Sequence, residues 1–145
     1  MPAFRFTLAR VLAWRELQRD IEEQKLLALR GELEALETEL SRLAAERERA
    51  LAAAGGLGVE LAQLAVYEQA LAARERSGRA RREDCRRRLA AQHARWSSAE
   101  RACRLLEKLK ARRKAEFTAA EGRELERLAN ELFLAAWGRQ TGGRE

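Results

Sequence analysis

The feature that most constrains this chain is an uninterrupted second half. Between Val59 and Gly138 there is no proline, because the single proline of the chain is Pro2. Such a stretch can form one helix roughly 120 Å long at 1.5 Å per residue. The first half permits a helix only from about residue 5 to residue 54, so the two cannot match in length. Part of the second helix is therefore expected to lack a partner within the hairpin.

The composition restricts the fold class to all-α. Ala, Glu, Leu and Arg dominate, with 46% hydrophobic and 36% charged residues, which is typical of a long helix or coiled coil. Aromatic residues make up only 6%, and no segment shows the β-branched alternation of strands. A large globular core is not expected.

Leucine spacing and one glycine-rich break define the organisation. The alternating steps of three and four residues are those of a left-handed coiled-coil seam, at Leu26, Leu29, Leu33, Leu36, Leu40 and Leu43. Gly55–Gly58 ends this helix. We predict a single coiled-coil domain over 1–145, an antiparallel two-helix coiled-coil hairpin with a longer, projecting second helix. Its parts are helix one at about 5–54, a turn at 55–58, helix two at about 59–137 and a flexible tail at 138–145.

The register follows from the position of the bend. A bend centred near residue 56 places Gly31 near Gly78 and Leu40 near Leu71. Toward the start of the chain the seam becomes less regular, and a broader apolar face is expected from Phe4, Leu8, Val11, Leu12, Trp14, Leu17 and Ile21. Cys85 and Cys103 lie about 27 Å apart along one helix, too far for a disulfide, and are expected on the inner seam.

Neither a catalytic centre nor a cofactor site is expected. His93 is the only histidine, and no Cys/His spacing of a zinc site occurs. The glycine break follows no strand and precedes no Gly-Lys-Ser/Thr, so it is not a phosphate loop. No apolar run approaches the ~20 residues that span a bilayer, and the start lacks an apolar signal region. We expect a non-enzymatic cytoplasmic protein with no metal and no transmembrane segment.

Charge and apolar pattern suggest a binding surface in the second helix. Before residue 59 there are nine basic and ten acidic residues, and from there on twenty and thirteen. The basic residues concentrate at 74–88 and 101–114. Beyond about Lys108, Leu125, Leu128 and Leu132 continue an apolar stripe that usually marks an interaction surface. Glutamates interrupt both basic stretches, which weakens a nucleic-acid interpretation.

Two motifs at matching spacing suggest a family. The opening Phe4-Arg5-Phe6-Thr7-Leu8-Ala9-Arg10-Val11-Leu12, followed by Arg15, resembles the start of the flagellar export protein FliJ family. The segment Leu106-Glu107-Lys108-Leu109-Lys110-Ala111-Arg112-Arg113-Lys114, followed by Glu116-Phe117, is similar to the best-marked C-terminal motif of that family. The resemblance spans nearly the whole chain.

The resemblance implies a soluble stalk of the flagellar type III protein export apparatus, peripheral at the cytoplasmic face of the inner membrane. Its partners would be the hexameric export ATPase, the cytoplasmic domain of the export gate and export chaperones, with no specific nucleic acid. We expect the ATPase-ring contact to comprise Arg101, Arg104, Lys108, Lys110, Arg112, Arg113, Lys114, Leu125, Leu128 and Leu132. The export-gate contact would comprise Leu61, Leu64, Tyr67 and Leu71. Members of the family often have two tyrosines three residues apart at the start of the second helix, and here Leu64 stands at the first of these positions. For Leu61, Leu64 and Leu71 the alternative is a place in the intramolecular seam.

Three other readings remain open from the sequence. The first is the equivalent stalk of a virulence-type injectisome, which would likewise couple an ATPase ring to an export gate. A basic helical hairpin that binds structured RNA would show steeply salt-dependent binding. A self-associating coiled coil would bury the late leucines in a dimer.

Overall fold

The chain folds into two helices. The computed structural model describes residues 2–53 and 58–143, and for residues 58–60 it describes the backbone alone. Within them, α1 spans Ala9–Ala52 and α2 spans Gly58–Thr141, 44 and 84 residues, and no strand occurs. The predicted all-α fold with a longer second helix is confirmed. Neither helix, over its described residues, combines the length and apolarity needed to cross a bilayer.

The start of α1 lies later than predicted. Residues 2–6 are not helical, and the helix begins at Ala9 rather than near residue 5. The amide of Ala9 donates to the Phe6 carbonyl at 3.1 Å, closing a turn just before the helix. Phe6 is buried and Phe4 contacts Phe117 of α2, with ring centroids 5.6 Å apart. These aromatic contacts hold the first residues outside a helical path.

The second helix exceeds its predicted range at both ends. It begins at Gly58, which we had assigned to the turn, and residues 138–141 of the predicted flexible tail are helical. A single glycine costs a helix only about 1 kcal/mol relative to alanine, so Gly138 does not end it. The amide of Gly142 donates to the Gly138 carbonyl at 3.1 Å and closes the last turn. Residues 54–57 and 144–145 lie outside the described residues.

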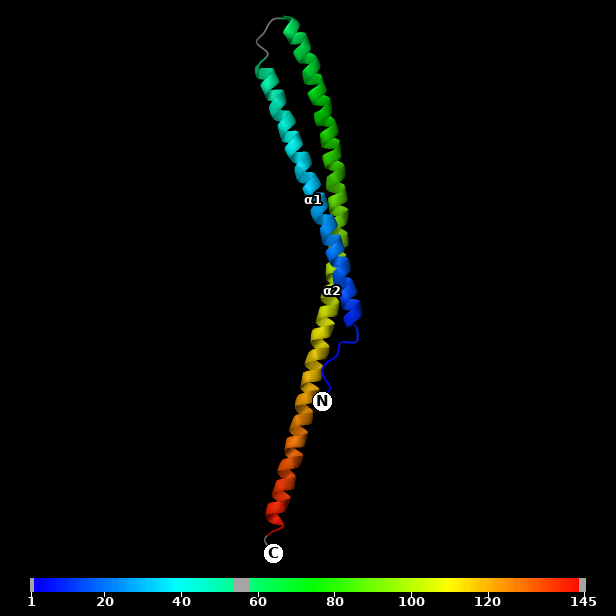
Figure 1. Cartoon of the computed structure of the whole chain (residues 1–145), viewed down its shortest axis with the longest axis vertical. Helices are drawn as coiled ribbons and strands as arrows, with labels where there is room; N and C mark the ends of the chain where they lie inside the picture. Colours follow the sequence, from blue (N-terminus) through cyan, green and yellow to red (C-terminus); the bar gives the residue numbers. More distant parts are fainter. Residues whose placement is uncertain (1, 54–57, 144–145) are drawn as a thin grey trace. The chain divides into compact units, whose positions relative to one another are not determined.

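The chain divides into two compact units. The hairpin unit is Leu17–Glu100, and the terminal unit is Met1–Glu16 with Arg101–Glu145. In the hairpin unit α1 and α2 lie side by side (Figure 1). The thiol of Cys85 donates to the Leu29 carbonyl at 3.6 Å, and the Gln92 amide donates to the Glu22 carbonyl at 3.0 Å. Because later residues of α2 meet earlier residues of α1, the helices are antiparallel.

A narrow apolar seam holds the hairpin unit together. None of the six predicted seam leucines is exposed, and Leu26, Leu40 and Leu43 are buried. From α2 the seam takes Leu71 and Cys85, both buried. In the terminal unit, Phe6, Leu12 and Cys103 are buried. The placement of both cysteines on the inner seam is confirmed, and neither has any exposed surface.

The broad apolar face predicted near the start of α1 is only partly buried. Leu12 is buried, whereas Val11, Trp14, Leu17 and Ile21 are exposed. The reason is helical geometry, since residues three and four apart share a face and the seam uses the face of Leu12. Trp14 instead lies under the guanidinium of Arg15, 5.0 Å from the ring centroid. The apolar residues at the start of α1 therefore form two faces rather than one.

The predicted pairing of Gly31 with Gly78 does not occur. Leu40 packs against Gly78, because a Cβ added to Gly78 would lie 2.8 Å from Leu40 Cδ2. A Cβ added to Gly31 would meet nothing within 4 Å, so the two glycines do not face each other. In Figure 1 the first turns of α2 reach past the end of α1.

Gly31 and Gly78 should respond differently to replacement by alanine. We expect Gly31→Ala to raise the free energy of unfolding by about 1 kcal/mol, because alanine is the better helix former and the site is open. Gly78→Ala should raise it by less, since Leu40 has to move away from the new methyl group. Urea titrations followed by circular dichroism would measure both. Equal gains from the two substitutions would contradict the observed register.

Candidate functional site

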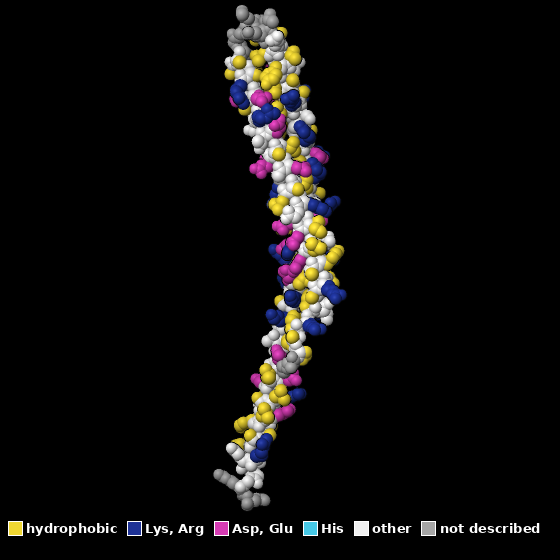
Figure 2. All heavy atoms as spheres, in the orientation of Figure 1, with side chains coloured by type: hydrophobic (Ala, Val, Ile, Leu, Met, Phe, Trp, Pro, Cys, Tyr) yellow, Lys and Arg dark blue, Asp and Glu magenta, His cyan; other side chains and the backbone are white. Residues whose placement is uncertain are grey.

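Charged pairs between the helices supplement the seam of the hairpin unit. Arg47 reaches across to Glu68 at 3.3 Å and to Glu75 at 3.2 Å. Other cross-helix pairs join Arg86 to Glu37 at 3.5 Å, Arg88 to Glu32 at 3.3 Å and Arg19 to Glu100 at 3.8 Å. Figure 2 shows Lys and Arg side chains interspersed with Asp and Glu along this unit. Many of its cations are thus already occupied by carboxylates of the same chain.

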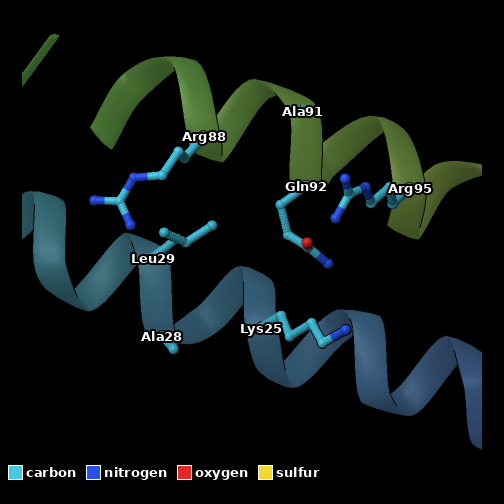
Figure 3. A pocket seen from close by; sticks show the side chains of 7 residues that line it. All are labelled: Lys25, Ala28, Leu29, Arg88, Ala91, Gln92 and Arg95. Carbon is cyan, nitrogen blue, oxygen red and sulfur yellow. The ribbon is translucent and has the colours of Figure 1, made fainter. Parts of the chain in front are cut away.

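The groove shown in Figure 3 belongs to this network. Residues from both helices line it, namely Lys25, Ala28, Leu29, Arg88, Ala91, Gln92 and Arg95. Gln92 is buried and also donates to the Glu22 carboxylate, which lowers the pKa of Glu22. Lys25 pairs with Glu22 at 3.6 Å, and Arg88 pairs with Asp84 at 3.2 Å in addition to its cross-helix partner. These nearby carboxylates offset the positive charge of the groove, so we do not assign an anion site there.

The predicted export-gate residues separate into two kinds. Leu61 and Tyr67 are 45% and 47% exposed, and Leu64 is half-buried. Leu71 is only 2% exposed and lies inside the seam. A partner could therefore reach Leu61 and Tyr67 but not Leu71 without opening the hairpin. For Leu71 the structure favours the intramolecular alternative.

The predicted basic residues all lie on exposed turns of α2 in the terminal unit. Segment 101–114 contains seven basic residues and one acidic residue. Each of Arg101, Arg104, Lys108, Lys110, Arg112, Arg113 and Lys114 is exposed. Because successive residues turn by about 100°, these cations point to several sides of α2. One of them, Arg113, donates from Nη1 to Thr7 Oγ1 at 3.1 Å and so also fixes the N-terminal segment.

The C-terminal part of α2, from residue 122 onward, is exposed. Every described residue from 122 to 143 is exposed, including Leu125, Leu128 and Leu132. These three leucines share one side of the helix, within about 60° of one another by helical geometry. They bring a stripe to the surface but do not touch the basic residues, which lie at least two turns earlier.

Next to the predicted contact Leu132, the last turns of α2 carry three apolar residues that were not among the predicted contacts, Phe133, Leu134 and Trp137. Leu132, Phe133, Leu134 and Trp137 are between 59% and 70% exposed. Neighbouring side chains among them diverge by about 100°, so Leu132, Phe133 and Leu134 point to three sides, and the rings of Phe133 and Trp137 stack 6.5 Å apart. We call residues 132–137 the apolar tip. A helical-wheel analysis of this segment would have revealed it, because alanines occupy the remaining directions.

No family model, no curated protein and no solved structure matches this chain. The described residues also contain no group of three or more His, Cys, Asp or Glu side chains able to hold a metal ion.

Proposed function

We propose that this chain is a non-enzymatic stalk of the flagellar type III protein export apparatus. In this proposal the C-terminal part of α2 inserts into the hexameric export ATPase, and the turns around Leu61 and Tyr67 contact the cytoplasmic domain of the export gate. The chain would act in the cytoplasm, held at the inner membrane by the apparatus, and would also meet export chaperones. The stalk of an injectisome has the same geometric requirement, and neighbouring genes would distinguish the two systems.

The observation that carries the proposal is the apolar tip. A helix that is apolar on one side can be covered by one flat partner, whereas a helix that is apolar all round must be enclosed. Leu132, Phe133 and Leu134 are exposed and point to different sides of the helix, so a partner that covers one side leaves some of them in water. The pore of a ring-shaped assembly encloses a helix on all sides. A ring with six subunits also fits a basic segment whose cations point in several directions.

The two sequence motifs support the same partner. The basic motif ends just before Phe117, and the N-terminal motif contains Phe4 and Thr7. Phe4 contacts Phe117, and Thr7 accepts a hydrogen bond from Arg113. The two segments that resemble the FliJ family therefore contact each other within the terminal unit. This is the arrangement expected if both motifs serve one binding surface.

The proposal is tested with purified export ATPase. Adding the full chain is expected to raise ATP turnover and hexamer formation, because an enclosed helix stabilises the ring. A variant that ends at Gly122 keeps the Phe4–Phe117 and Thr7–Arg113 contacts but lacks the stripe and the tip. It should melt at nearly the temperature of the parent and leave turnover at its basal rate. Unchanged turnover and no hexamer with the full chain would contradict the proposal.

A further inference from the structure

The charge of α2 reverses between the basic segment and the apolar tip. Residues 101–114 carry seven basic and one acidic side chain, whereas residues 116–131 carry two basic and five acidic ones. All the charged side chains of 116–131 are exposed except that of Glu121, which is half-buried. One uniformly acidic partner surface would attract the first segment and repel the second. The two segments therefore need partner surfaces of different charge.

The acidic residues are not spread evenly about the leucine stripe. By the turn of about 100° per residue, Glu121 falls in line with the stripe, and Glu124 and Glu131 border one edge of it. The opposite edge carries Gly122 and Ala129, which have no charge. Arg123 and Arg127 fall on the far side of the helix, where Arg127 reaches round to Glu131 at 3.7 Å. The stripe thus has one acidic edge and one neutral edge.

From this asymmetry we infer that the stripe Leu125, Leu128 and Leu132 docks into an apolar groove of the partner bordered on one side by lysine or arginine side chains. This inference rests on the proposed function and adds the chemistry of the receiving surface. Opposite charges along the border of an apolar contact fix its orientation and register. The basic segment would meet a separate, acidic surface of the same ring.

A second copy of this chain fits the stripe less well. In an antiparallel pair centred on Leu128, the two acidic edges would face each other, and like charges directly opposed are destabilising. In a parallel pair the acidic edge would meet the neutral edge and gain no charge attraction. An apolar groove with a basic border would bury the leucines and place positive charge opposite the glutamates.

The test compares two charge reversals of equal size on opposite faces of α2. The double variant Glu124→Lys with Glu131→Lys reverses the acidic edge. The matched control, Glu116→Lys with Glu126→Lys, makes the same change in net charge on the far side of the helix. Binding of each full chain to purified export ATPase is measured by titration. We expect the edge variant to bind about tenfold more weakly than the parent and the control variant to stay within about twofold.

The outcomes separate the inference from the function on which it rests. If the parent binds and both variants lose affinity equally, the basic border is wrong and the stalk proposal stands. If the parent does not bind the ATPase, both are overturned. Sedimentation of the parent alone adds one further outcome, because a dimer that only the edge variant dissociates would assign the stripe to a second copy and overturn the inference.

Discussion

Replacing Leu71 with alanine is expected to lower the free energy of unfolding of the hairpin unit by about 2–5 kcal/mol, the usual cost of emptying a buried leucine site. Leu71 is 2% exposed and is one of few large apolar side chains that α2 contributes to the seam. Gly78 and Cys85 at neighbouring seam positions are small, so little can move in to fill the space. Urea unfolding followed by circular dichroism would measure the loss.

Leu61 provides the matched control for this prediction. It is a leucine of the same helix but is 45% exposed, so Leu61→Ala should change the free energy of unfolding by less than about 0.5 kcal/mol. If the two substitutions had equal effects on stability, Leu71 would not be a core residue. Its predicted role as a contact for the export gate would then regain support.

Replacing the two aromatic residues of the apolar tip is expected to weaken binding to the export ATPase by roughly a hundredfold, since buried aromatic anchors are the commonest hot spots of interfaces. The change is Phe133→Gln with Trp137→Gln, which keeps side chains compatible with a helix. Both side chains are exposed and stack on each other within the terminal unit, so their replacement opens no buried site. The melting temperature should therefore stay unchanged while affinity falls.

The control for the tip variant uses apolar residues that are exposed elsewhere. Leu17 and Ile21 lie on the outer face of α1 and have no assigned partner in the proposal. Leu17→Gln with Ile21→Gln should leave ATPase affinity within about twofold, because surface changes outside an interface core contribute little. If this control weakened binding as much as the tip variant, enclosure of the tip would not be the source of affinity.

The exposed binding surfaces could be predicted from the sequence only in part. The basic segment was recognisable because its cations are consecutive, and the stripe because Leu125, Leu128 and Leu132 keep helical spacing. Phe133 and Leu134 escaped the list of contacts because they do not fit that spacing. Leu71 was assigned to a contact surface because it completes the patch around Tyr67 that the family resemblance implies, and only packing separates a seam residue from an exposed one.

The sequence by itself determined the class of the fold. Leucines at three- and four-residue steps and the absence of proline after Pro2 require long helices, because these patterns act through local geometry. The tertiary structure decided the register, which places Leu40 against Gly78, and the late start of α1 at Ala9. Registers that differ by one heptad keep the same face inside, so local periodicity cannot select between them. Contacts between residues far apart in the chain make that choice.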